Sequence, residues 1–132
     1  PYLVAEQDGV PVGYAYAGKF HERVAYDWSV ETSIYVEQHR KRQGIGRLLH
    51  DALEQELQRR HFLNMNACVA CPIGENDPYL TRDSICFHEK LGYRVVGEFH
   101  QCGYKFGRWY HMVWLEKHIG SHEGTPLPVL RG

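Results

Sequence analysis

The sequence has 132 residues, of which 43% are hydrophobic and 23% charged, and its net charge is -1; this composition is that of one globular domain, not of a disordered or fibrous chain. The near-neutral charge argues against a protein that binds nucleic acid or an anionic membrane surface. Because no apolar run approaches the ~20 residues that span a bilayer and the first residues lack the order of a secretory signal, we expect a cytoplasmic protein without a membrane partner.

A hairpin followed by a longer strand is predicted in the first part of the chain. Residues 2–6 and 12–17 are short apolar or alternating runs, and the segment between them contains Asp8-Gly9, a strong turn signal. From Trp28 to Val36 apolar residues occupy the even positions, while the odd positions are mostly polar. This strand therefore has one apolar and one polar face, and Glu31 lies in the polar row.

An amphipathic helix is predicted after the loop at 39–44, because apolar residues recur at i, i+3, i+4 and i+7. These residues are Ile45, Leu48, Leu49, Ala52, Leu53 and Leu57. The later elements are a strand at 63–70, a loop at 72–78, a helix at 84–91 closed by Gly92, and strands at 93–101 and 109–116. We expect a domain over residues 1–117 and a Gly- and Pro-containing C-terminal tail over 118–132.

The segment that links the long strand to the amphipathic helix is predicted to bind a phosphate group. A helix N-terminus presents N–H groups without intrahelical partners and the positive end of the helix dipole. Gly44 and Gly46 allow close approach to that backbone, and the basic run 40–42 adds charge. A solvated basic loop before a helix would show the same pattern. The spacing matches neither Gly-x-Gly-x-x-Gly nor Gly-Lys-Ser/Thr, which argues against a dinucleotide or P-loop site.

Residues 41–46 resemble the Arg/Gln-x-x-Gly-x-Gly/Ala loop with which GNAT N-acetyltransferases grip the pyrophosphate of coenzyme A, with Lys41 at its first position. Further segments resemble the phosphinothricin acetyltransferase branch of that superfamily. They are Ala25-Tyr26-Asp27-Trp28, residues 31–36, residues 88–93 and residues 103–109. The resemblance covers roughly residues 1–117.

This resemblance implies an α+β fold of GNAT type, with a mixed, mostly antiparallel, twisted sheet flanked by helices. The family's N-terminal strand and two helices would precede Pro1, so we expect them to be missing. It also implies acetyl-CoA as co-substrate, no metal, and a homodimer. The implied acceptor is the α-amine of a small amino acid such as phosphinothricin, methionine sulfoximine or methionine sulfone, attacking the thioester directly with a carboxylate base.

Contacts with coenzyme A are implied along the long strand, the Gly-containing loop and the later loop and short helix. The residues are Ile34, Tyr35, Val36, Lys41, Arg42, Gln43, Gly44, Ile45, Gly46, Arg47, Asn76 and Ser84. The loop from Asn76 to Asp83 looks longer than in the family.

Glu31 matches the proposed base of the family, and His88 matches a histidine thought to support that carboxylate. An amino-acid amine is mostly protonated at neutral pH, so a base is needed before it attacks. Lys19, Arg23 and Tyr26 match the region that receives the acceptor, and a forked guanidinium suits its anionic groups. From the residues alone, Glu31 also fits an exposed strand carboxylate, His88 a core histidine and Arg23 a solvated loop arginine.

Other functions remain open at this stage. Within the same fold, the acceptor could be a protein N-terminus or a polyamine, although a polyamine favours acidic residues where Lys19 and Arg23 lie. A non-catalytic acyl-CoA-binding domain is a second class. A nucleic-acid binder using residues 40–42 is a third, against which the net charge argues. Cys68-x-x-Cys71 has the spacing of zinc ligands but no second pair follows, so we expect no metal and read the four cysteines as thiols.

Overall fold

The computed structural model describes residues 1–40, 43–74 and 76–131. Two compact units emerge from it, one made of Pro1–Met65 with the C-terminal residues from His118, the other of Asn66–Lys117. Each unit carries one α-helix, and the strand pairs with a described register are antiparallel, which confirms the predicted α+β class. Neither described helix is long and apolar enough to cross a membrane.

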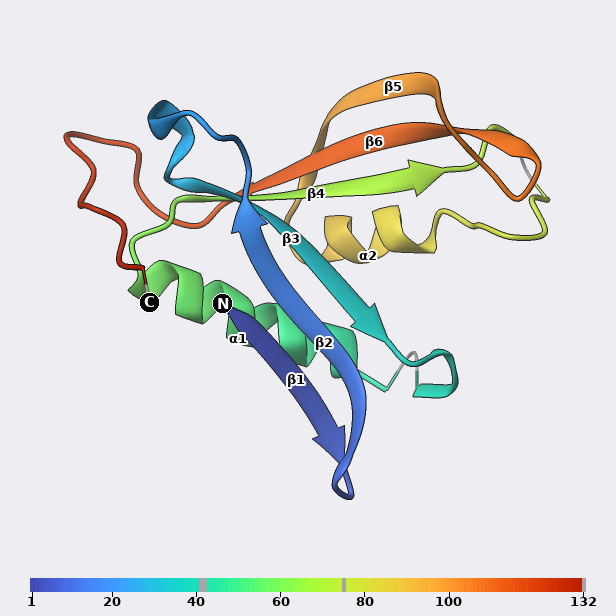
Figure 1. Ribbon diagram of the computed structural model, residues 1–132, viewed down its shortest axis with the longest axis horizontal. Helices are drawn as coiled ribbons and strands as arrows, with labels where there is room; N and C mark the ends of the chain where they lie inside the picture. Colours follow the sequence, from blue (N-terminus) through green and yellow to red (C-terminus); the bar gives the residue numbers. More distant parts are fainter. Residues whose placement is uncertain (41–42, 75, 132) are drawn as a thin grey trace. The chain divides into compact units, whose positions relative to one another are not determined.

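Three antiparallel strands form the sheet of the first unit (Figure 1). They are β1 (Tyr2–Gln7), β2 (Val10–Lys19) and β3 (Ser29–Val36). The predicted Asp-Gly turn joins β1 to β2, with positive φ at both Asp8 and Gly9. In the β2–β3 register Gly18 lies opposite Glu31 and Lys19 opposite Val30. Directly opposed residues share a face, so this register decides which side chains meet.

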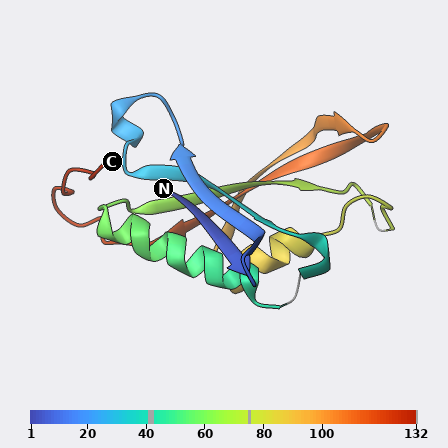
Figure 2. The same cartoon turned by 60° about the horizontal axis from the view of Figure 1, so that its bottom comes forward.

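Helix α1 (Ile45–Arg59) packs on one face of β1, β2 and β3, as both views show (Figures 1 and 2). Gly13 of β2 permits a close approach. A Cβ at Gly13 would lie 2.7 Å from the Tyr35 carbonyl oxygen and 3.1 Å from Leu49 Cδ1, tighter than real side chains tolerate. Because Gly13 has no Cβ, the Leu49 side chain of α1 can pack directly against the backbone of β2.

The buried stripe of α1 differs from the predicted one. Leu49, His50, Leu53 and Leu57 are buried, whereas Leu48 is 67% exposed and Ala52 is also exposed. Leu49, Leu53 and Leu57 are spaced four apart and set the side of the helix that meets the sheet. His50 shares a face with Leu53 and Leu57, three and seven residues on, so it enters the core in place of Leu48.

The second unit contains the strands β4 (Asn64–Cys71), β5 (Arg94–Lys105) and β6 (Arg108–His118), in the order β4-β6-β5, and the helix α2 (Asp83–Lys90) (Figure 1). Gly92, at φ 100°, follows α2 as predicted. Strand β5 runs four residues beyond the predicted end. Its register with β6 shifts between Phe99 and Gly103, so the chain accommodates extra residues and continues to a turn at Phe106-Gly107.

Residues Ile119–Arg131 form neither helix nor strand, yet they are bound to the first unit. We call this segment the C-terminal strap. Its Ile119 N–H donates to the Leu63 carbonyl at 2.8 Å, and its Leu130 N–H donates to the Arg60 carbonyl at 3.0 Å. The region predicted as a tail is thus packed against the end of α1 and the start of β4.

Candidate active site

Glu31 lies on the face of β3 that points away from α1. Its neighbours Val30 and Thr32 are 3% and 5% exposed and point into the core, so alternation directs the half-buried Glu31 to the other face. Gly18, directly opposite, has no side chain, and no described heavy atom beyond its chain neighbours lies within 4 Å of where its Cβ would be. The carboxylate therefore borders open space that a ligand can enter.

Four tyrosines continue the face that carries Glu31. Tyr35 lies four residues along β3 and is opposite Tyr14, whose ring stacks on it at 5.3 Å between centroids. Tyr14 is also stacked with Tyr2 at 5.8 Å and with Tyr16 at 6.1 Å. Tyr35 is 52% exposed. The carboxylate thus lies at one end of an accessible aromatic row.

The N-terminus of α1 has the geometry of an anion site. Gly44 adopts φ 81° and ψ 2°, and the first helical hydrogen bond runs from the Leu48 N–H to its carbonyl at 3.0 Å. The N–H groups of Ile45, Gly46 and Arg47 precede that bond and lack intrahelical partners. No described side chain caps Gly44. These donors and the helix dipole favour a negatively charged ligand. Lys41 and Arg42 fall outside the described residues.

His88 is buried in the second unit, at 7% exposure, on the core side of α2. Its Nδ1 lies 2.7 Å from the Ser84 carbonyl, which can only accept, so Nδ1 carries the proton and Nε2 keeps its lone pair. The ring meets Tyr93 edge-on at 4.9 Å. Burial lowers the pKa of His88 below its ordinary value, although the Ser84 carbonyl acts in the opposite sense. The imidazole is therefore neutral at pH 7, and its Nε2 can accept a hydrogen bond.

The three predicted acceptor residues lie at or just after the end of β2. Lys19 shares a face with Val30, so its side chain is on the opposite side of the sheet from Glu31. Together with Tyr26 it lines a cavity of about 200 Å³. Tyr26 ends the short 3₁₀ helix η1 (Val24–Tyr26), and exposed Arg23 immediately precedes it. The structure does not place Lys19 on the face of Glu31.

A family model described as an acetyltransferase (GNAT) domain matches residues 1–114. The chain belongs to this family. It is 40% identical over 129 residues to a phosphinothricin N-acetyltransferase of Streptomyces viridochromogenes, covering 98% of this chain and 66% of that protein. It is 32% identical to an L-methionine sulfoximine/L-methionine sulfone acetyltransferase of Salmonella typhimurium, covering 92% of this chain and 67% of that protein.

The same fold occurs in a solved GNAT phosphinothricin acetyltransferase of Sinorhizobium meliloti in complex with acetyl-CoA. The match has a TM-score of 0.83 and 32% identity, and it covers 96% of this chain and 65% of that one. The predicted GNAT-type fold is thereby confirmed. The chain spans about two thirds of the length of the relatives that it matches.

The residues predicted for this GNAT chain divide between its two units. The first contains Glu31, Ile34, Tyr35, Val36, Gln43, Gly44, Ile45, Gly46, Arg47, Lys19, Arg23 and Tyr26. The second contains Asn76, Ser84 and His88. Asn76 is exposed and adopts φ 61°, a left-handed conformation that asparagine tolerates better than most residues. Ser84 is exposed in the first turn of α2.

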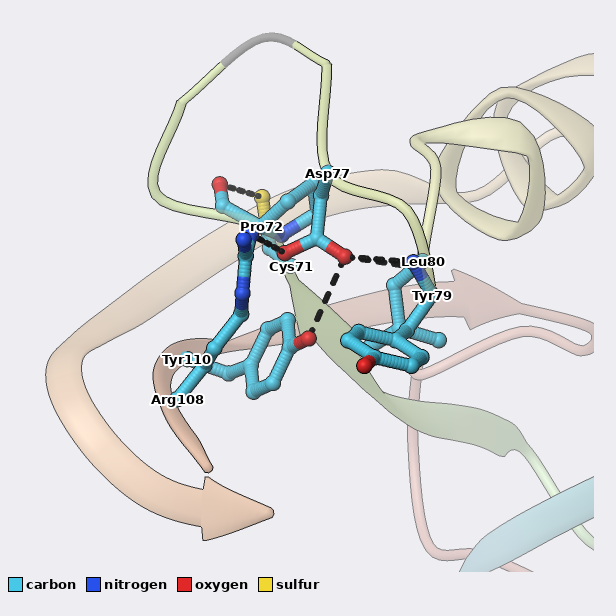
Figure 3. Close-up of polar contacts among 7 residues, drawn as sticks. All are labelled: Cys71, Pro72, Asp77, Tyr79, Leu80, Arg108 and Tyr110. Carbon is cyan, nitrogen blue, oxygen red and sulfur yellow. Dashed lines mark hydrogen bonds and ion pairs between the residues drawn. The ribbon is translucent and has the colours of Figure 1, made fainter. Parts of the chain in front are cut away.

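Asp77, which the sequence analysis did not single out, organises the loop after Asn76 (Figure 3). Its Oδ1 accepts from the N–H groups of Tyr79 at 2.8 Å and Leu80 at 3.0 Å, and from the Tyr110 hydroxyl at 3.2 Å. Arg108 Nη1 donates to Oδ2 at 3.3 Å. The carboxylate ties the loop to the start of β6. The pattern Asp-Pro-x-x could have indicated it, because Asp accepts from N–H groups two and three residues on.

The pKa of Asp77 is set by opposing effects. Burial of its side chain, which is 8% exposed, would raise the pKa, but the donors from Tyr79, Leu80, Tyr110 and Arg108 together lower it. Burial raises the pKa of the Tyr110 phenol, and Asp77 raises it further. Tyr110 therefore remains a donor to an ionised Asp77 at neutral pH.

We expect Asp77→Asn to lower Tm at pH 7, and we expect this decrease in Tm to become smaller at acidic pH. The folded-state pKa of Asp77 lies below its ordinary value of 3.8, so its stabilisation is present above about pH 4 and is lost as pH falls toward the lowered pKa. Thermal melts of the parent and the variant at pH 7, 5 and 3 should show a Tm gap that narrows with acid. Asp83→Asn, at an exposed position of α2, is the control. A Tm difference that stays constant with pH would show that the negative charge of Asp77 does not stabilise the fold.

Proposed function

We propose that this chain is an acetyl-CoA-dependent N-acetyltransferase that acts on the α-amine of a small amino acid such as phosphinothricin, methionine sulfoximine or methionine sulfone. The observation that carries the proposal is the position of Glu31 beside open space on β3, the strand that leads to the Gly44 turn and the N-terminus of α1. A carboxylate base and an anion site thus occur on one short stretch of chain. The names of the GNAT relatives support the reaction.

In this mechanism Glu31 accepts the proton that the acceptor ammonium must lose. Acetyl-CoA supplies the acetyl group as a thioester. The neutral amine forms a C–N bond to the acetyl carbon and the C–S bond breaks; the nitrogen then loses its second proton, which the leaving thiolate takes up. The pyrophosphate of acetyl-CoA is held by the α1 dipole and by the N–H groups of Ile45, Gly46 and Arg47. These groups bind the co-substrate and take no part in proton transfer, which is the role of Glu31.

His88 takes a refined role in the proposal. In the neutral form, with Nδ1–H donating to Ser84, its Nε2 accepts a hydrogen bond and cannot donate one to a carboxylate. Donation to a carboxylate would require the imidazolium, which burial disfavours. We therefore propose that His88 acts in the reaction as a neutral hydrogen-bond acceptor and not as a donor to a carboxylate.

The acceptor is expected to be a small anionic amino acid, since Arg23 places a cation in the loop after β2, whereas Lys19 lies on the opposite side of the sheet from Glu31. Release of thiol from acetyl-CoA is to be measured with phosphinothricin, methionine sulfoximine, methionine sulfone, spermidine and a peptide with a free N-terminal alanine. We expect kcat/KM for the best amino acid to exceed that for spermidine at least tenfold, about 1.4 kcal/mol. A preference for spermidine or the peptide would overturn the acceptor class. Binding of acetyl-CoA without turnover of any amine would indicate an acyl-CoA-binding domain.

A homodimer and a cytoplasmic location, both implied earlier, remain predictions. Light scattering coupled to size-exclusion chromatography tests the first, with a mass of twice 15.4 kDa expected.

A further inference from the structure

The loop that joins β2 to β3 has little regular structure of its own. This segment, Phe20–Trp28, is called the acceptor loop here because it carries Arg23 and Tyr26. Its helical content is limited to η1, and Tyr26 is 47% exposed. Within the loop the Arg23 N–H donates to His21 Nδ1 at 3.2 Å, and the rings of His21 and Tyr26 meet at 5.0 Å. Such a loop depends on tertiary anchors for a fixed conformation.

The C-terminal strap supplies anchors at the last two residues of the acceptor loop. Arg131 Nη2 lies 3.6 Å from Asp27 Oδ1, an ion pair in which the two side chains are half exposed or less. The Trp28 indole N–H donates to the Leu127 carbonyl at 2.8 Å. Figures 1 and 2 both show strap and loop at the same end of the first unit. The C-terminal strap thus contacts two consecutive residues of the acceptor loop, Asp27 and Trp28.

The strap is itself hydrogen-bonded to the C-terminal end of α1 and the residues that follow it. Gln58 Nε2 donates to the Ile119 carbonyl at 3.0 Å, and His61 Nδ1 lies 2.9 Å from the Pro128 carbonyl, which accepts from it. The Leu130 N–H donates to the Arg60 carbonyl at 3.0 Å. Prolines at 126 and 128 restrict the strap's own backbone. It therefore connects the C-terminal end of α1 to the acceptor loop, whose own internal contacts are short-range.

A cavity of about 200 Å³ separates parts of the loop and the strap. Lys19 and Tyr26 line it from the loop side, while Arg60, Leu130 and Arg131 line it from the other. The space gives the loop room to shift when its links to the strap are lost, because little packing has to be displaced. The two strap links at Asp27 and Trp28 limit that movement, together with the Leu63 and Asn64 N–H groups, which donate to the Trp28 carbonyl at 2.9 and 3.2 Å.

We propose that the C-terminal strap positions the acceptor loop, and that Arg131 is a positioning residue for the acceptor amine. The inference rests on the proposed function, in which Arg23 binds the acceptor. A loop held in its binding conformation before the acceptor arrives loses less conformational freedom on binding, so the strap lowers the KM for the acceptor. It has no role at the N-terminus of α1, so the KM for acetyl-CoA is independent of it.

The test compares Arg131→Ala, Arg131→Lys, Trp28→Phe and removal of residues 126–132 with the parent chain. Arg94→Ala, which breaks an exposed ion pair with Glu116 between β5 and β6, is the matched control. Arg131→Ala and Trp28→Phe should each raise acceptor KM about two- to fivefold, with kcat and acetyl-CoA KM unchanged. Arg131→Lys should keep the acceptor KM close to that of the parent. The truncation should raise the acceptor KM more than either single variant does.

Hydrogen exchange gives a readout that does not depend on activity. Amides of residues 20–28 should exchange faster in Arg131→Ala and in the truncated chain than in the parent or in Arg94→Ala. Faster exchange in the strap with an unchanged loop would overturn the proposal, as would equal increases in both KM values. If the parent chain acetylates no amine, the proposed function fails and the proposed effect on acceptor KM fails with it, while exchange still decides whether the strap holds the loop.

Discussion

Replacing Glu31 with glutamine is expected to lower kcat about 10²–10⁴-fold at pH 7. The amide keeps the size and hydrogen-bonding reach of the side chain but cannot accept the amine proton. Because Glu31 is half-buried, with open space beside Gly18, the substitution disturbs little packing. Acetyl-CoA affinity should be unchanged, since the carboxylate lies on β3 rather than at the N-terminus of α1. Steady-state kinetics with a saturating acceptor measure the effect.

The pH dependence separates proton transfer from a structural role of Glu31. The loss should shrink as pH rises, because more of the amine then arrives deprotonated and needs no base. Glu37→Gln is the control, since Glu37 follows β3 directly and pairs with Arg40 at 3.4 Å in an exposed setting. A Glu31→Gln variant that turns over at the parental rate from pH 6 to 9 would exclude the carboxylate as the base.

Gly44→Val should raise the dissociation constant for acetyl-CoA at least tenfold, about 1.4 kcal/mol. At φ 81° a β-branched residue is strained, so the turn must rearrange and redirect the N–H groups of Ile45, Gly46 and Arg47. Those donors are the proposed pyrophosphate site. Isothermal titration calorimetry gives the constant, and circular dichroism reports whether α1 still forms.

A matched glycine separates local strain from lost binding. Gly9 has φ 80° in the β1–β2 turn, and no described atom beyond its chain neighbours lies within 4 Å of its would-be Cβ, as at Gly44. Gly9→Val should therefore bring similar backbone strain and leave acetyl-CoA affinity unchanged. If the two variants bind acetyl-CoA equally well, the pyrophosphate is not held at the α1 N-terminus.

Local sequence patterns were sufficient to predict β3, which carries Glu31, and the helix ends. The alternation from Trp28 to Val36 places Glu31 opposite the buried face because the period of a strand leaves no other choice. Gly92 marks the end of α2 because it adopts the left-handed conformation that glycine accepts. These signals are short-range, so neighbouring residues determine them.

Features that depend on packing between distant segments were not predictable in this way. Which residues of α1 are buried depended on how the helix meets the sheet, which placed His50 in the core and Leu48 in solvent. The face of Lys19 followed from its register with Val30, and the role of Asp77 from Tyr110 and Arg108, about thirty residues on.

The amino-acid sequence by itself determined the order of helices and strands, because periodicity is a property of adjacent residues, and its resemblance to GNAT acetyltransferases supplied the family and the candidate base. The tertiary structure alone decided the proton position on His88, the anchoring of the loop by Asp77 and the binding of the strap to Asp27 and Trp28. Each of these depends on burial or on partners set by the fold, and such contacts leave no periodic signal in the chain.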